Sequence, residues 1–312
     1  MIAVGNLTAG GTGKTPLVGW IIGYLRGRQT RPVILSRGYG RTSTGVRVVS
    51  DGVRLLTDAT EGGDEPVQLA RSFPDVPVVV GERRNAAARV AMSLFHPDVL
   101  VLDDAFQHRA IARDLNILVV DGSRDIAQEQ MLPGGRRREP LSALQRASVV
   151  VFTHVDPATG AGACEATVRK WFHGHVMYCT RMIGSFVEPE GREIPATAIQ
   201  GERCLLVSGI GNPGRFETAM RGLGAVVSGH LQFRDHHRYT EDEVKAMVDA
   251  AAAEKVRRIV TTEKDMVRLM AVPGAMRMLE GTAHVAAAVL SVQVHPAGLL
   301  ESHIDACLGR MA

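Results

Sequence analysis

The sequence predicts an α/β protein built on a mostly parallel sheet with helices on both faces. Short apolar runs alternate with segments of helical length through the first half of the chain, and a second alternating set follows. This alternation is typical of parallel sheets, whose strands are buried on both sides and joined by crossover helices. A Gly-rich segment that ends in Lys14-Thr15 directly follows the first run, which indicates a sheet of the P-loop NTPase type.

Each element follows from the spacing of apolar residues and from the turn residues between them. Strands are expected at Ile2-Val4, Pro32-Leu35, Val76-Val80, Val99-Asp103, Asn116-Val120, Val149-Phe152, Cys204-Ser208, Ala225-Leu231, Arg258-Thr261 and Val285-Val294. Helices are expected at Thr15-Arg26, Glu65-Ser72, Arg83-Phe95, Arg215-Gly222, Glu241-Glu254 and Pro296-Leu308.

The segment Ile183-Ala198 contains two prolines and a glycine and is predicted to be a connection. The chain has 312 residues, enough for about two domains. We therefore predict a P-loop domain over residues 1–185 and a smaller α/β domain over residues 186–312 that completes the cleft.

Composition limits the class of protein. Hydrophobic residues make up 45% and charged residues 22%, as in soluble globular proteins, and the net charge of +3 is too small to indicate nucleic-acid binding. The four cysteines form no CxxC pair, so neither a zinc site nor a disulfide framework is expected, and a reducing compartment is favoured. The sequence shows neither an apolar run of about 18 residues nor a signal peptide.

The Gly-rich segment runs from Gly5 to Thr15, between the first strand and an amphipathic helix. Its backbone N–H groups can surround phosphate oxygens, Lys14 can reach the β- and γ-phosphates, and the Thr15 hydroxyl can bind Mg²⁺. Thr8 stands where the common pattern has glycine, but the core GGTGKT is intact. The residues predicted to bind the nucleotide are Thr8, Ala9, Gly10, Gly11, Thr12, Gly13, Lys14 and Thr15.

Acidic residues follow two other predicted elements. Asp103 and Asp104 close an apolar strand, where P-loop enzymes place a Mg²⁺ carboxylate, although one of them could cap a turn. Asp64 and Glu65 follow two glycines. They could act as a base and a metal ligand, or Asp64 could be the N-cap of the next helix.

Further polar clusters follow other strands. Ser36-Arg41 and Leu132-Pro140 combine glycines with arginines and could hold anions, or could be solvated surface. Phe233-Tyr239 contains two adjacent histidines, and Thr261-Asp265 is typical of a helix N-cap box. Thr153-His154-Val155-Asp156 has the position of a guanine-reading NKxD loop but lacks its Asn and Lys, so guanine selection is weakly supported.

Taken together, these motifs resemble the tetraacyldisaccharide 4'-kinase family, the lipid A 4'-kinases of Gram-negative bacteria. The shared motifs occur in order from Gly5 to Leu269: GNLTAGGTGKTP, LSRGYGR, GDEP, DDAFQHR with RDL, LPGGRRREP, GIGNPGRF, FRDHHRY and TEKDMVRL. The resemblance implies transfer of a phosphoryl group from ATP, with Mg²⁺, to the 4'-hydroxyl of a tetraacylated glucosamine disaccharide 1-phosphate. It also implies a peripheral protein at the cytoplasmic face of the inner membrane.

The same resemblance implies roles for individual residues. Lys14 serves the nucleotide, and Asp64 is the base that activates the hydroxyl, assisted by His236 or His237, with a slight preference for His237. Thr15, Asp103 and Asp104 are the implied metal ligands. The implied substrate-binding residues are Arg37, Arg83, His108, Arg138 and Glu139.

Two other classes share parts of this pattern. Another P-loop small-molecule kinase or ligase would have GGTGKT and the Asp103 strand but would not need the histidine pair. A nucleotide-dependent switch or metallochaperone GTPase would need a guanine-selecting loop and metal-binding Cys or His clusters, and the sequence shows neither.

The resembled family usually has an amphipathic helix before the P-loop strand, whereas this sequence starts at the strand. Either a preceding segment is missing or another surface docks on lipid. Trp20, Ile21, Ile22, Tyr24 and Leu25 could form such a surface, but their helical spacing favours a core position. The small positive charge would favour an anionic bilayer.

Overall fold

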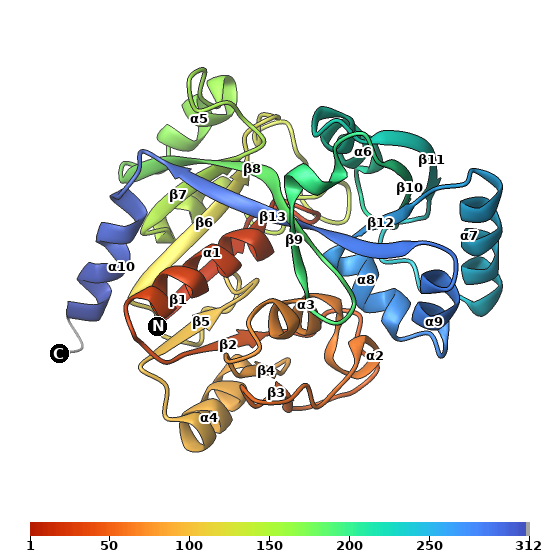
Figure 1. Cartoon of the computed structure of the whole chain (residues 1–312). Helices are drawn as coiled ribbons and strands as arrows, with labels where there is room; N and C mark the ends of the chain where they lie inside the picture. The colour runs from red at the N-terminus through yellow and green to blue at the C-terminus, as the bar shows by residue number, and fades with distance from the viewer. Residues whose placement is uncertain (310–312) are drawn as a thin grey trace.

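The computed structural model describes residues 1–309 and is organised around one large, mostly parallel sheet (Figure 1). The fold class expected from the sequence is confirmed. The strands are β1 (Ile2–Asn6), β2 (Pro32–Ser36), β3 (Arg47–Ser50), β4 (Val78–Val80), β5 (Val99–Leu102), β6 (Leu115–Asp121), β7 (Val149–Thr153), β8 (His175–Val187), β9 (Glu193–Pro195), β10 (Arg203–Ser208), β11 (Val226–Gln232), β12 (Arg258–Thr262) and β13 (His284–His295). Their order in the sheet is β11-β10-β12-β13-β8-β7-β6-β1-β5-β2-β4-β3, and β9 pairs with β8 beside this path.

The helices connect these strands, and some of them begin at side-chain caps. Thr240 and Glu243 form a capping box at the start of α7, and Asn212 caps α6, which has Pro213 in its first turn. The helices are α1 (Lys14–Gly27), α2 (Ala59–Gly62), α3 (Asp64–Ser72), α4 (Arg84–Phe95), α5 (Gly162–Arg169), α6 (Pro213–Gly222), α7 (Glu241–Ala253), α8 (Glu263–Met270), α9 (Ala275–Glu280) and α10 (Leu299–Gly309), with 3₁₀ turns η1 (Leu141–Arg146) and η2 (Ala196–Ile199).

Strand β1 is buried on both faces of the sheet. Ile2 and Val4 pack into one apolar cluster with α1, whereas Ala3 packs into another with α4 on the opposite face. Both neighbours of β1, which are β5 and β6, run parallel to it. Because parallel strands end at the same edge of the sheet, the loops after β1, β5 and β6 meet there.

The two long strands β8 and β13 pair antiparallel and join the halves of the sheet (Figure 1). The expectation of a connection over Ile183-Ala198 is wrong in part, because β8 continues to Val187 and β9 pairs back onto it. Gly191, with φ 92°, lies in the tight turn between β8 and β9. The proline and glycine residues of this segment therefore mark a hairpin turn rather than an interdomain loop.

The final helix returns to the first half of the molecule. Leu300 and Ile304 of α10 are fully buried in the same cluster as Ile2, and the Tyr24 hydroxyl donates a hydrogen bond to Asp305. The predicted boundary between residues 185 and 186 falls inside β8. The division into residues 1–185 and 186–312 stays a prediction, and packing places α10 with the first part.

The apolar residues of α1 lie where their spacing predicted. Ile21, Ile22 and Leu25 are fully buried, and Trp20 and Tyr24 pack against the same core. Within residues 1–309, none of the helices has the length and apolar character needed to cross a bilayer.

Gly5 allows β1 to pack closely against the loop after β5. A Cβ placed on Gly5 would lie 2.5 Å from the backbone N of Phe106 and 2.6 Å from its Cβ, so Gly5→Ala forces backbone to move. We expect a loss of about 1–3 kcal/mol in the free energy of unfolding, measured by urea denaturation. The control is Gly23→Ala in α1, where no atom lies within 4 Å and helix propensity predicts a gain of about 0.5–1 kcal/mol. Equal stability of the two variants would contradict this account.

Candidate functional site

The Gly-rich loop between β1 and α1 is braced from inside. The Asn6 side-chain amide donates hydrogen bonds to the Thr8 carbonyl at 2.6 Å and to the Thr12 hydroxyl at 2.9 Å. Gly10 and Gly13 have φ values of 108° and 87°, which side chains rarely tolerate. The loop therefore holds a turned backbone with its N–H groups available at the start of α1, the arrangement that binds phosphate.

The segment with three consecutive arginines supports this loop from outside. The Ala9 N–H donates to the Arg136 carbonyl at 2.7 Å, and the Arg138 N–H donates to the Leu7 carbonyl at 2.6 Å. Thr8 is buried in this contact and forms a β-bridge with Arg137. Residues 136–138 thus pair with the loop like a strand and fix Thr8, which stands where the common pattern has glycine.

Positive and negative side chains meet beside the loop. Lys14 Nζ lies 3.5 Å from Asp104 Oδ1, and Arg138 Nη1 donates to Asp104 Oδ2 at 3.0 Å. Glu139 accepts hydrogen bonds from Arg146 at 2.7 Å and from Gln107 at 3.0 Å. The structure therefore places Lys14, Asp104 and Arg138 in one charged group, with Glu139 on the adjoining segment.

Asp103 is fully buried, and neither of its carboxylate oxygens has a hydrogen-bond partner in the structure. Burial raises its pKa to about 7, and the negative charges of Glu65 and Asp104 act in the same direction. Burying a carboxylate without a partner costs free energy, so this position favours binding of a cation.

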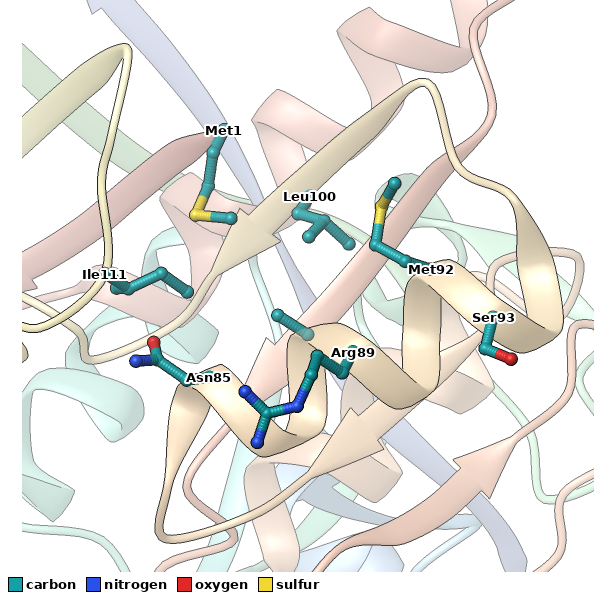
Figure 2. A pocket seen from close by; sticks show the side chains of 8 residues that line it. Met1, Asn85, Arg89, Met92, Ser93, Leu100 and Ile111 are labelled. Carbon is teal, nitrogen blue, oxygen red and sulfur yellow. The ribbon is translucent and has the colours of Figure 1, made fainter.

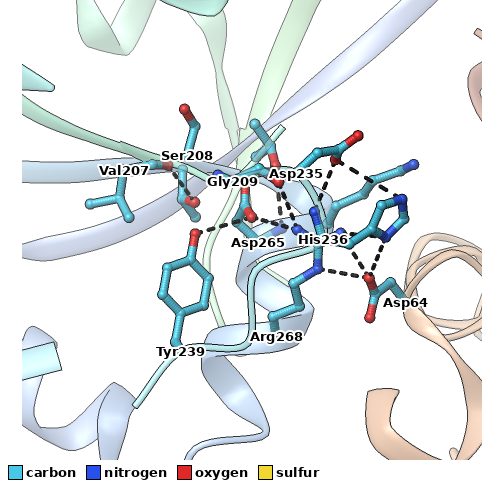
Figure 3. A network of polar contacts seen from close by, with 12 residues as sticks. Asp64, Val207, Ser208, Gly209, Asp235, His236, Tyr239, Asp265 and Arg268 are labelled. Carbon is cyan, nitrogen blue, oxygen red and sulfur yellow. Dashed lines mark hydrogen bonds and ion pairs between the residues drawn. The ribbon is translucent and has the colours of Figure 1, made fainter. Parts of the chain in front are cut away.

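Asp64 lies in the first turn of α3 and faces the second half of the molecule (Figure 3). Its Oδ2 accepts a hydrogen bond from Arg268 Nε at 2.7 Å and lies 3.2 Å from His236 Nδ1. Burial by itself would raise the pKa of Asp64, but the hydrogen bond with His236 and the charge of Arg268 outweigh it and lower the pKa. The alternative N-cap role is not seen, because Gly63 is the N-cap of α3 and makes no side-chain cap bond.

The two adjacent histidines have different partners. His236, with φ 58°, turns toward Asp64, whereas His237 Nε2 lies 2.9 Å from Glu243 and its ring stacks on Phe233 at 4.9 Å. The preference for His237 as the partner of Asp64 is therefore corrected to His236. The left-handed backbone at His236 sends the two neighbouring rings to separate sites.

Arg268 and Asp265 anchor this arrangement and were not predicted as site residues (Figure 3). Arg268 is almost completely buried and donates to the Gly209 carbonyl and to Asp265 Oδ1, both at 2.9 Å. Thr262 caps α8 as expected, and the carboxylate of Asp265 reaches back to the Thr262 hydroxyl at 2.7 Å rather than to its backbone N–H. Asp265 also accepts hydrogen bonds from the Gly209 N–H at 3.0 Å and from the Tyr239 hydroxyl at 3.1 Å.

A second ion pair joins the same helices, which lie side by side in Figure 1. Lys264 of α8 donates to Glu65 of α3. Burial by itself would raise the pKa of Glu65, but the Lys264 charge outweighs it and lowers the pKa, and Lys14 adds to this effect. Glu65 therefore lies between the Asp64 group and the phosphate loop and brings them into one site.

The remaining predicted substrate residues lie around the loop after β5. Burial lowers the pKa of the half-buried His108, and the nearby charges of Arg84 and Arg37 lower it further. Arg37 and Arg83 are exposed, and Arg83 has no side-chain partner within residues 1–309. The neighbouring Arg84 is buried and donates to the Gly81 carbonyl at 2.7 Å. This structural role was not predicted from the sequence.

An open apolar pocket lies at the opposite edge of the sheet, around the starts of β1 and β5 (Figure 2). None of the predicted site residues lines this pocket. Its lining consists of Met1, Asn85, Ala88, Arg89, Met92, Ser93, Leu100 and Ile111.

Comparison with known proteins identifies the family to which this chain belongs. The sequence profile of the LpxK family, tetraacyldisaccharide-1-P 4'-kinase, matches residues 1–308. The chain belongs to this family. It is therefore a kinase, and the predicted ATP-dependent 4'-kinase activity in lipid A biosynthesis is the activity of the family. The alternatives of another P-loop kinase or ligase and of a GTPase switch are set aside.

Individual relatives cover most of the chain. A tetraacyldisaccharide 4'-kinase of Chlorobium luteolum is 41% identical over 90% of this chain and 80% of its own length. One from Geobacter metallireducens is 38% identical over 99% of this chain and 88% of its own length. The crystal structure of LpxK from Aquifex aeolicus in complex with ATP has a TM-score of 0.78 and 30% sequence identity, and covers 98% of this chain and 88% of that chain.

Proposed function

We propose that this kinase transfers the γ-phosphoryl group of ATP to the sugar 4'-hydroxyl with Asp64 as the proton acceptor. The observation that supports this assignment is the one-sided use of its carboxylate. Oδ2 contacts both Arg268 and His236, whereas Oδ1 has no hydrogen-bond partner within the described residues. Oδ1 is therefore free to accept a hydrogen bond from an incoming hydroxyl.

His236 has a supporting role in this scheme. Its Nδ1 contacts both Asp64 at 3.2 Å and Arg268 at 3.2 Å, so the ring fixes the orientation of the carboxylate and can take part in moving the proton. Arg268 keeps the carboxylate ionised, because its charge stabilises the deprotonated form.

The phosphate loop supplies most of the stabilisation of the transferred group. Its N–H groups and Lys14 surround the phosphates in this scheme, and Lys14 lies 3.5 Å from Asp104. A sugar hydroxyl is a weak nucleophile, so positioning and charge neutralisation contribute most to the rate.

The acidic residues near Lys14 fit a magnesium ion. Asp103 has two unpartnered buried oxygens, and the Thr15 hydroxyl lies at the start of α1, so both offer the oxygen ligands that Mg²⁺ prefers. We propose that Asp103, Asp104 and Thr15 hold Mg²⁺, directly or through water, together with nucleotide phosphates. The ion would neutralise charge on the β- and γ-phosphates when bound.

Basic residues provide recognition of the phosphorylated disaccharide. Arg37 and Arg83 are exposed, and the charges of Arg37 and of the buried Arg84 both act on His108. We propose that these residues, with Arg138 and Glu139, contact the acceptor or the transferred phosphate. Exposed arginines suit this purpose because their planar groups bind phosphate through paired hydrogen bonds.

Replacing the proposed base tests the assignment directly. In Asp64→Ala we expect turnover to fall by several orders of magnitude, because the hydroxyl loses its proton acceptor, while ATP binding is retained. The measurement is formation of the bisphosphate product from labelled ATP, Mg²⁺ and the disaccharide 1-phosphate in detergent. The control is Asp75→Ala, which breaks an exposed pair with Arg26 in the last turn of α1, at the opposite end of that helix from the phosphate loop. Near-normal turnover of Asp64→Ala would reject Asp64 as the base.

The pH profile tests the role of Arg268. Its charge lowers the pKa of Asp64, so Arg268→Gln should raise that pKa and move the acidic limb of kcat/KM to higher pH. Activity of the variant should be lost at pH values where the native enzyme still works, because Asp64 becomes protonated there. Arg221→Gln, which breaks an exposed pair with Glu217, should leave the limb in place. Thermal melting and nucleotide binding check that Arg268→Gln is folded. If the acidic limb of kcat/KM does not move in the folded variant, the proposed role of Arg268 is wrong.

We also propose that the enzyme acts as a peripheral protein on the cytoplasmic face of the inner membrane of a Gram-negative bacterium. The acceptor is a lipid, and the net charge of +3 favours an anionic surface. We expect the protein to sediment with vesicles of anionic lipid at low salt and to be released at high salt. Failure to bind anionic vesicles, or equal binding to zwitterionic ones, would contradict an electrostatic contribution.

A further inference from the structure

Three polar side chains meet at the edge of the sheet on the other side of the phosphate loop. Asp121 ends β6, His154 follows β7, and Arg181 lies on β8. His154 belongs to the segment that has the position of an NKxD loop but not its residues. The catalytic scheme uses none of these three side chains.

The group is ordered by its own contacts. His154 has φ 61° and is nearly buried, with Nδ1 3.2 Å from Asp121 Oδ1 and Nε2 against Arg181 Nη2. Asp121 also accepts a hydrogen bond from the Ser123 hydroxyl at 2.6 Å. Burial by itself would raise the pKa of Asp121, but the hydrogen bonds with His154 and Ser123 outweigh it and lower the pKa, which keeps the carboxylate charged. Asp121 therefore orients His154, and His154 contacts the guanidinium of Arg181.

The Arg181 guanidinium lies directly against the phosphate loop. A Cβ placed on Gly13 would lie 2.9 Å from Arg181 Nη1 and 3.5 Å from the Thr153 methyl group. The Thr153 hydroxyl donates to the Thr12 carbonyl at 2.8 Å, so β7 is tied to the same turn of the loop. Arg181 thus occupies the space beside the residue that precedes Lys14.

Some N–H donors of Arg181 have no hydrogen-bond partner within the described residues. His154 is its only hydrogen-bond partner within residues 1–309, which leaves Nε and Nη1 without one. Arg215, at the start of α6, is close enough for its charge to lower the pKa of Arg181, after the larger effect of burial. Two neighbouring positive charges of this kind favour binding of an anion.

The sheet order indicates which anion this is. Strand β1 lies between β5 and β6, and Lys14 lies toward Asp104 on the β5 side. If Lys14 contacts the γ-phosphate, as in the proposed function, the nucleoside end of ATP would extend toward β6, β7 and β8. We propose that Arg181 binds the α-phosphate of the nucleotide and that His154 and Asp121 are the positioning residues that aim it. This inference rests on ATP binding at the loop, as in the proposed function.

Nucleotide binding by the full chain tests the proposal. In Arg181→Met we expect the Kd of ADP and the KM of ATP to rise roughly 10- to 100-fold, the effect of losing a charge-assisted hydrogen bond. The KM of the lipid acceptor should stay unchanged. Arg181→Lys, which keeps the charge but loses the fork, should show a smaller rise, as should His154→Gln. The matched control is Arg192→Met, which breaks an exposed pair with Glu188 in the nearby hairpin and should change neither constant.

The outcomes separate this inference from the proposed function. If the native protein fails to bind ADP, the proposed function fails. If the native protein binds ADP and folded Arg181→Met or Arg181→Lys binds it equally well, only the role of Arg181 fails. Comparing ADP with GDP distinguishes phosphate from base recognition: equal losses for both support the α-phosphate, whereas a loss confined to ADP overturns it. A lower melting temperature of the nucleotide-free variant with unchanged constants shows a merely structural residue and likewise overturns the proposal.

Discussion

The contact between Asp64 and Arg268 is the interaction on which the site depends. It crosses from α3, beside the phosphate loop, to α8 in the second half of the molecule. The buried Arg268 would not be stable without a partner, because an unpaired buried charge costs several kcal/mol. Asp265 balances the rest of the Arg268 charge, and Glu65 with Lys264 repeats the pairing one residue along α3. The charges that form the site therefore add to the β8–β13 pairing that joins the two halves.

The phosphate loop shows how a departure from a common pattern is accommodated. Thr8 would disturb a loop that relied on glycine there, but residues 136–138 pair with it as a short strand. The same segment carries Arg138 to Asp104. A cluster that could have been solvated surface is thus part of the nucleotide site, because its backbone is needed to complete the loop.

Features with local causes were predictable from the sequence, and features with distant causes were not. The phosphate loop, the strand before Asp103 and most helix boundaries depend on apolar spacing and caps, which neighbouring residues determine. The choice between His236 and His237 depends on one left-handed backbone angle, and Arg268 meets Asp64 across 204 positions of sequence. The return of α10 to the first core likewise depends on tertiary packing.

The lowered pKa of Asp64 limits how it can act. A carboxylate stabilised by Arg268 and His236 is a weaker base than a free one, so it cannot hold a proton from a sugar hydroxyl in the ground state. It becomes an effective acceptor only as the hydroxyl loses electron density to the phosphoryl group, late in the transfer. In the proposed scheme, Lys14 and the loop would therefore stabilise the transferred group first. Asp64, as the proposed base, would then direct the hydroxyl and remove its proton as the new bond forms.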